Sequence, residues 1–233
     1  MNSVLFEQSG PVGIVTLNRP EVMNAFNFDM LQELSGYVDS IRINPEIQLV
    51  LFTAAGDRAF SVGADLKERK NLPQQLVYRN LNKFGEVFTA IEQLPQPTIC
   101  VINGFAFGGG LELALACDFR MAANHVKVGL TETGLGIIPG AGGTQRLPRL
   151  IGETRALELI LTAKHITAEE GLSYGLFTLI TDKEALQETA LQFAQAILAN
   201  APIALQQAKF AVKQGMKVDI QTGLQIERKA YEI

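Results

Sequence analysis

Two glutamates in the sequence lie among apolar and small residues, where a charged side chain is unusual and suggests a specific role. Glu112 follows three consecutive glycines and opens an apolar run, and Glu132 lies in the segment 128–134 beside valine, leucine and glycine. Burial raises the pKa of a carboxyl group toward the range where it can exchange protons near neutral pH. The pair could therefore share general acid and base work on one substrate. An alternative role for Glu112 is to interact with the dipole of the helix that it opens.

Two segments of small residues could bring backbone N–H groups against a ligand. Segment 103–112 leads from a predicted buried strand into an apolar helix, and its three glycines are conformationally costly. They indicate either a tight turn or N–H groups exposed at a helix start, ready to bind a developing oxyanion. Segment 59–68 follows another strand, and its small residues would let a ligand approach the main chain. An ordinary strand-to-helix turn fits that segment equally well.

Three other patterns predict no chemistry. Segment 171–175 reads Gly-Leu-Ser-Tyr-Gly, which fits a nucleophile elbow, but it follows a helix start and precedes a strand, the reverse of what an elbow needs. We expect it to be a helix end closed by Gly175. His125 and His165 lie in polar surroundings, which favours surface or structural roles. Segment 134–143 is rich in glycine but lacks the lysine of a phosphate-binding loop.

The elements that must position these residues alternate between strands and helices. A helix is predicted from the apolar face of Leu31, Leu34, Val38 and Ile41, capped by Asn27 or Asp29. The remaining expectations are a hairpin over 4–7 and 12–17, strands over 48–53, 98–102 and 119–122, a helix over 74–94, a loop over 104–110 and a buried helix over 111–117. This alternation predicts an α/β fold with mostly parallel pairing.

The last third of the sequence becomes helical. Thr167 to Glu170 form a predicted capping box, and a strand is expected over 177–181. Helical patterns then cover 183–199, 203–215 and 219–233. We therefore predict a core over 1–182 that carries the active site, and an α-helical C-terminal region over 183–233.

The composition limits the classes of protein to which this chain can belong. Of 233 residues, 47% are hydrophobic and 19% charged, which is enough to bury a core. The formal net charge of −4 lowers the expectation of a nucleic-acid partner. Cys100 and Cys117 are the only cysteines, and no metal-ligand spacing occurs. No apolar run reaches the roughly 20 residues needed to span a bilayer, and no secretory signal is recognised. We expect a cytoplasmic protein without a membrane partner.

Four segments together resemble the enoyl-CoA hydratase/isomerase (crotonase) family over essentially the whole chain. They are residues 18–26, 60–68, 103–112 and 138–149, in the family's order and spacing. Segments 63–69, 129–133 and 218–224 look closest to the methylglutaconyl-CoA hydratase branch. The resemblance implies a spiral of β-β-α turns with a C-terminal α-helical trimerisation region. It also implies an acyl-CoA thioester as ligand and a homo-oligomer, either a trimer or a dimer of trimers.

The resemblance further implies roles for particular residues. The N–H groups of Ala64 and Gly109 would form the oxyanion hole, and Glu112 and Glu132 would be the catalytic carboxylates. The implied substrate-binding residues are Ala25, Ser61, Gly63, Ala64, Asp65, Leu66, Lys67 and Gly109. No metal and no separate cofactor are implied, because coenzyme A is part of the substrate.

The activity expected from this resemblance is reversible syn addition of water to a short-chain or 3-methylglutaconyl-type 2-enoyl-CoA. The alternatives are an enoyl-CoA isomerase, another crotonase-fold decarboxylase or hydrolase, and an AU-rich RNA-binding protein. Only Lys67, Arg69 and Lys70 form a basic cluster, which Glu68 interrupts, so RNA is the less favoured partner.

The sequence identifies fewer residues of the acyl pocket than of the reacting centre. We expect the helix over 74–94 to build part of this pocket. The family normally continues past the position of Ile233 into a helical segment near the pocket, and we expect pocket closure to depend on such a segment. An acidic acyl group would need a cation in the pocket. The sequence leaves open whether Lys70, Arg79 or Lys83 reaches it.

Overall fold

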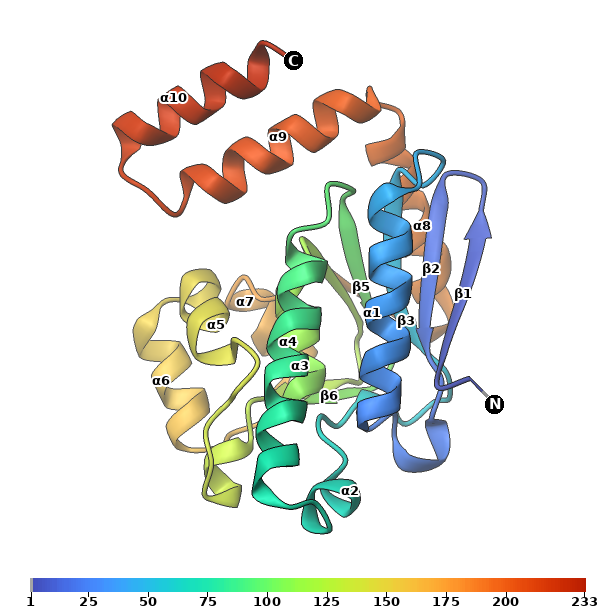
Figure 1. The fold of residues 1–233 in the computed structure, drawn as a ribbon, viewed down its shortest axis with the longest axis vertical. Helices are drawn as coiled ribbons and strands as arrows, with labels where there is room; N and C mark the ends of the chain where they lie inside the picture. Colours follow the sequence, from blue (N-terminus) through green and yellow to red (C-terminus); the bar gives the residue numbers. More distant parts are fainter. Residues whose placement is uncertain (1) are drawn as a thin grey trace.

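A six-stranded sheet forms the centre of the computed structural model, which describes residues 2–233 (Figure 1). Its strands lie in the order β1 (Val4–Ser9), β2 (Val12–Leu17), β3 (Leu49–Ala54), β5 (Thr98–Ile102), β7 (Phe119–Ala123) and β10 (Leu179–Thr181). The first two strands form an antiparallel hairpin, and every later pairing in this sheet is parallel. The predicted α/β class with mostly parallel pairing is confirmed.

A second, smaller sheet holds four short strands. They are β4 (Ala59–Ser61), β6 (Phe105–Phe107), β8 (Lys127–Gly129) and β9 (Ile166–Thr167), parallel except for the last pair. The expectation that 104–110 is entirely loop was wrong, because β6 lies between β4 and β8. Three residues are too few for the alternation of buried and exposed side chains to be recognised in a sequence. Their pairing depends on strands far away in the chain.

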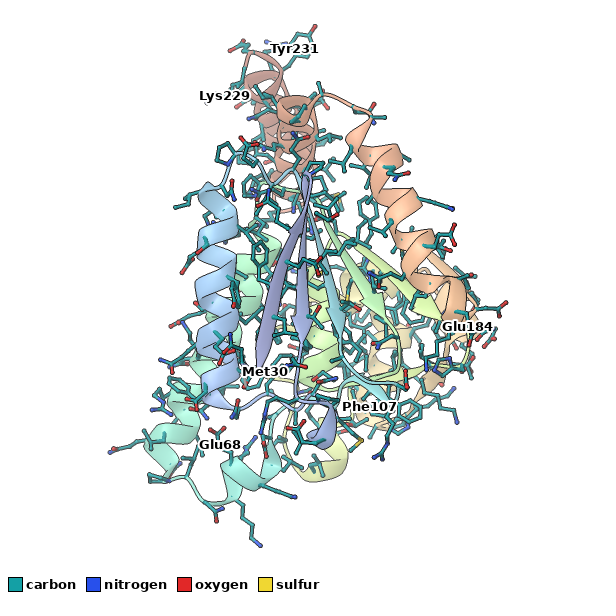
Figure 2. The ribbon with its side chains drawn as sticks, turned by 90° about the vertical axis from the view of Figure 1, so that its right-hand side faces the viewer. Met30, Glu68, Phe107, Glu184, Lys229 and Tyr231 are labelled. Atoms are coloured by element: carbon teal, nitrogen blue, oxygen red, sulfur yellow. The ribbon has the colours of Figure 1, made fainter. Side chains whose placement is uncertain are left out.

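Helices cover both faces of the large sheet. Helix α1 (Phe28–Ile43) begins where the Asn27 side chain accepts a hydrogen bond from the Met30 N–H at 3.0 Å. Helix α3 (Gln74–Glu92) buries Phe84 and Phe88, whose rings pack edge-to-face with each other and with Phe26. These two helices lie on one face, and α8 (Lys183–Leu198) lies on the other (Figure 2).

The remaining helices surround the ends of the sheets. They are α2 (Leu66–Lys70), α4 (Gly109–Ala116), α5 (Gly143–Ile151), α6 (Glu153–Leu161), α7 (Ala168–Ser173), α9 (Pro202–Gly215) and α10 (Ile220–Tyr231), with 3-10 turns η1 (Pro20–Val22) and η2 (Glu132–Leu135). The capping box at the start of α7 is confirmed. So is the helix end at 171–175, where Gly175 has a φ of 78°. His125 and His165 are both exposed, as predicted.

Helices α9 and α10 pack on each other and project beyond the sheets (Figure 1). The Lys209 and Lys213 ammonium groups bind the Asp118 carboxylate at 2.6 and 3.1 Å and so tie α9 to the start of β7. Helix α8 instead packs on the large sheet through Leu186, Ala190 and Ala194. The division of the chain at 182 stays a prediction. No helix in the described part of the chain is long and apolar enough to span a membrane.

Glycines allow the two segments that carry the candidate N–H groups to meet backbone to backbone. A Cβ atom on Gly63 would lie 2.8 Å from the Gly109 nitrogen, and a Cβ on Gly110 would overlap the Ser61 carbonyl. Real side chains do not fit at such distances. The start of α4 therefore approaches the end of β4 only because both segments lack side chains there.

This contact predicts that Gly110→Ala destabilises the protein, because the added methyl group would force backbone apart. We expect a loss of about 2–3 kcal/mol in the free energy of unfolding, measured by urea denaturation. Gly85→Ala is the matched control: a Cβ there meets open space in α3, so it should stabilise by up to about 1 kcal/mol. A Gly110→Ala protein as stable as the unmodified one would contradict this view of the contact.

Candidate active site

Glu112 lies in the first turn of α4 and is only 3% exposed. Its Oε1 accepts hydrogen bonds from the N–H groups of Ala141 and Gly143, each at 2.8 Å. Burial raises the pKa of Glu112, while the two N–H donors and the nearby Arg146 charge oppose that rise without cancelling it. The carboxylate form of this group thus has dedicated partners inside the protein.

Glu132 begins η2 and is less buried than Glu112. Burial, and then the charge of Glu112, raise the pKa of Glu132 to about 7. Within residues 2–233 its buried Oε2 has no hydrogen-bond partner. Both glutamates line one cavity, so the structure brings the two predicted carboxyl groups together. Near neutral pH such a pair can hold a single proton.

The N–H groups of Ala64 and Gly109 face the same cavity as the glutamates. Ala64 lies opposite Phe26 in an isolated parallel bridge, where the Phe26 N–H binds the Gly63 carbonyl at 2.8 Å and the Asp65 N–H binds the Phe26 carbonyl at 2.9 Å. In such a bridge the central residue turns its own N–H to the opposite side. Gly109 is the first residue of α4, so no preceding helical turn supplies it with an acceptor.

Neither N–H has an acceptor among the described residues. The two donors therefore lie at the wall of a cavity, at the positive end of a buried helix. This arrangement suits an oxygen atom that gains negative charge.

Asp65 fixes the loop that carries Ala64. Its carboxylate accepts hydrogen bonds from the N–H groups of Lys67 and Glu68 and so caps α2. It also forms an ion pair with Arg19 at 3.1 Å, and Arg19 donates a second bond to the Ala25 carbonyl at 2.6 Å. The loop is thereby held against segment 18–26.

Asn24 fixes the other side of this loop. It is fully buried with a φ of 53°, a conformation that asparagine tolerates better than most residues. Its side chain accepts a hydrogen bond from the Arg19 N–H and donates to the carbonyls of Ala55 and Ala59. Asn24 lies in segment 18–26, which resembles the family, but only the structure shows which groups its side chain binds.

Five of the residues expected to bind substrate line the cavity: Gly63, Ala64, Asp65, Leu66 and Gly109. Three others do not. Ala25 is buried behind the loop, with its carbonyl bound by Arg19. Ser61 is fully buried, and its hydroxyl donates to the Asn24 carbonyl and accepts from the Gly63 N–H, so it holds the loop in place. Lys67 is exposed on α2, outside the cavity wall.

The walls of the cavity are mostly apolar, and of these walls only the helix over 74–94 was expected from the sequence. The cavity holds about 910 Å³ of empty space, counting the part open to solvent. Its apolar walls come from α3, from the segment before α3, from the end of η2 and from the segment after η2, and they include Leu72, Val77, Leu81, Phe84, Leu135, Ile137 and Ile138. Leu81 lies one turn before Phe84 on α3, so the apolar periodicity of this helix could have identified it as a wall residue.

Three cationic residues were candidates for reaching the acyl pocket, and none of them lines this cavity. Arg79 stacks over the Phe28 ring at 3.6 Å, Lys83 donates to the Ser35 hydroxyl at 3.0 Å, and Lys70 is exposed. Arg69 does line it, together with Glu68 and Asn80.

Comparison with known proteins agrees with this geometry. The model of the enoyl-CoA hydratase/isomerase family matches residues 7–232. The chain is 41% identical over 232 residues to the short-chain-enoyl-CoA hydratase of Clostridium acetobutylicum, covering 99% of this chain and 88% of that protein. It is equally 41% identical over 231 residues to the mitochondrial methylglutaconyl-CoA hydratase of Mus musculus, covering 97% of this chain and 74% of that protein.

The fold agrees as well. The crystal structure of the enoyl-CoA hydratase from Bacillus anthracis superposes with a TM-score of 0.97 at 45% identity, covering 99% of this chain and 90% of that one. The crotonase fold expected from the sequence, with two sheets and C-terminal helices, is thereby confirmed. The buried carboxyl pair, the paired backbone donors and these similarities lead to one conclusion: the chain belongs to the enoyl-CoA hydratase/isomerase family.

Proposed function

We propose that this protein is an enoyl-CoA hydratase that reversibly adds water, with syn geometry, across the double bond of a 2-enoyl-CoA. The observation that carries the proposal is the pair Glu112 and Glu132, which line one cavity with different hydrogen-bond surroundings. An isomerase needs one carboxyl group to move a proton between two carbons. A second carboxyl group gives a water molecule a second partner, which favours hydration.

The thioester oxygen binds the N–H groups of Ala64 and Gly109. When water attacks C3, negative charge moves onto this oxygen as an enolate forms. Both donors and the positive end of α4 already face that position, so little reorganisation is needed. Loss of one such donor typically lowers the rate about 10²–10³-fold.

The two glutamates handle the protons of the water molecule. Glu112 acts as the carboxylate, because two backbone N–H groups favour its charged form. It takes a proton from water while the water oxygen bonds to C3. Glu132, whose pKa is raised to about 7, delivers its proton to C2. The proton on Glu112 then passes to Glu132, either directly or by release to solvent and uptake of a solvent proton by Glu132, so the pair begins and ends each cycle with one proton.

We also propose that the chain forms a homotrimer or a dimer of trimers through α9 and α10. These helices expose large apolar side chains, including Phe210, Val212 and Leu224. Exposed apolar area of this kind is typical of protein–protein contacts. Sedimentation equilibrium would give the mass of the assembly, and a monomer at micromolar concentration would contradict the proposal.

Substitution of either glutamate tests the mechanism directly. Glu112→Gln and Glu132→Gln should each lower kcat for crotonyl-CoA by roughly 10²–10⁴-fold, because each removes one proton transfer and keeps the side-chain shape. The loss of enoyl-thioester absorbance measures the rate. Glu169→Gln is the matched control, since Glu169 is exposed in the first turn of α7. Full activity in either test variant would remove that residue from the mechanism.

The need for one proton on the pair predicts a bell-shaped profile of kcat/KM against pH. As pH rises through about 7, Glu132 loses its proton and activity should fall. As pH falls and Glu112 also becomes protonated, activity should fall again. Rates measured from about pH 5 to about pH 9 would show both limbs. A rate that stays flat through neutrality in the unmodified protein would contradict a protonated Glu132.

A further inference from the structure

Arg146 lies behind the turn 141–143, which binds Glu112. It belongs to α5, its side chain is 14% exposed, and it lies outside the cavity wall. Its Nη1 donates a hydrogen bond to the Ala141 carbonyl at 2.8 Å. Gly142, with a φ of 106°, brings the main chain so close to the guanidinium that a Cβ atom there would overlap it. The turn is therefore folded around the guanidinium of Arg146.

The same turn carries the two donors of Glu112. The N–H groups of Ala141 and Gly143 bind Oε1 of Glu112, and the carbonyl that Arg146 holds lies between these two donors along the backbone. Backbone N–H groups that converge on one oxygen in this way form an anion-binding nest. Because Oε1 takes both donors, Oε2 is the oxygen that can accept a proton from water.

Glu92 holds Arg146 from the opposite side. Nε and Nη2 of the guanidinium donate to one oxygen of Glu92 at 3.1 and 2.8 Å, so this ion pair joins α3 to α5. Glu92 neutralises part of the charge of Arg146. The remaining charge still opposes the rise that burial causes in the pKa of Glu112.

The charged groups around Glu112 come from a small number of elements. Of the elements packed against α4, strands β4 and β6 contain no titratable residue, α5 contributes Arg146, and α3 contributes Glu92 through its ion pair. Glu132 faces Glu112 from η2. On the α2 side, the cavity is also lined by the charged residues Asp65, Glu68 and Arg69.

We propose that Arg146 is a positioning residue for the reaction: it holds the turn that orients Glu112, and it supplies the positive charge beside which Glu112 acts as a base. This inference rests on the proposed hydratase function and extends it to a residue behind the cavity. Arg146 does not touch the substrate. It therefore affects the rate through Glu112, whereas binding of the thioester does not depend on it.

Two substitutions break the same ion pair and have opposite electrostatic effects. Arg146→Met removes the positive charge near Glu112, which destabilises the carboxylate, so the acid limb of the kcat/KM profile should move to higher pH. Glu92→Gln removes the negative charge that offsets Arg146, so the acid limb should move to lower pH. If the pair only joined α3 to α5, both variants would shift this limb in the same direction or not at all. Either of those results would overturn the proposal.

The rates separate an effect on Glu112 from an effect on binding. Arg146→Met should lower kcat for crotonyl-CoA roughly tenfold to a hundredfold, as expected for loss of a charge-assisted hydrogen bond. KM should change less than about threefold, because Arg146 lies outside the cavity wall. A loss confined to KM would contradict a role through Glu112.

Two further variants serve as controls. Arg146→Lys keeps the positive charge, so its acid limb should stay near that of the unmodified protein. Arg149→Met makes the same change of charge one turn further along α5, on an exposed side chain, and should leave kcat and the acid limb unchanged. Circular dichroism checks that each variant is folded. If Arg146→Met does not fold, the shift to lower pH in Glu92→Gln still tests the proposal, and its absence would overturn it.

Infrared titration tests Arg146 without any reaction. In a Glu132→Gln background only one carboxyl group of the pair titrates, and the carboxyl stretching band of Glu112 is identified by its loss in Glu112→Gln. The midpoint of this band should move up in pH with Arg146→Met and down with Glu92→Gln. If no enoyl-CoA is hydrated but the midpoints move in this way, the hydratase proposal fails and the assignment of Arg146 stands. If hydration is observed but the midpoints coincide, the assignment of Arg146 fails.

Discussion

The whole site depends on one close approach between two stretches of backbone. The start of α4 meets the end of β4 where Gly63, Gly109 and Gly110 leave room for main-chain atoms alone. The contact brings the N–H groups of Ala64 and Gly109 to the same cavity and places Glu112 one turn further along. Asp65, Arg19 and Asn24 hold one side of the contact, and the buried helix α4 holds the other. The chemistry of the family therefore needs rigid support on both sides of a gap without side chains.

The two glutamates show how one type of side chain comes to have two different electrostatic environments. Glu112 is the more buried, yet two backbone N–H groups stabilise its charge. Glu132 is less buried, but its Oε2 lacks a partner and it faces the charge of Glu112, so its pKa rises to about 7. The difference comes from donors rather than from burial alone. Those donors are Ala141, which precedes α5, and Gly143, the first residue of α5, and both lie in segment 138–149.

The elements that could be predicted from the sequence are those that local sequence patterns determine. Strand β5 matches its predicted range because prolines precede it, and α1 begins at the expected cap, Asn27. Glu112 and Glu132 stood out because carboxylates are unusual among apolar and small residues, whereas Ala64 and Gly109 were named only through the resemblance to the family. The short strands of the small sheet were missed because three residues carry no readable period. The position of Arg69 could not be predicted, because the direction that a residue faces on a five-residue helix depends on what packs against it.

The ion pairs that hold α9 have a mechanical consequence. Asp118 binds not only Lys209 and Lys213 but also the N–H and hydroxyl groups of Thr98, the first residue of β5. The other end of β5 leads directly into the segment that ends at Gly109. A force on the projecting helices is thus transmitted to the five-residue strand β5, whose far end supports the backbone that carries the Gly109 N–H. The neighbouring strands β3 and β7 pair with β5, so a force on the C-terminal helices spreads over the large sheet before it reaches the cavity.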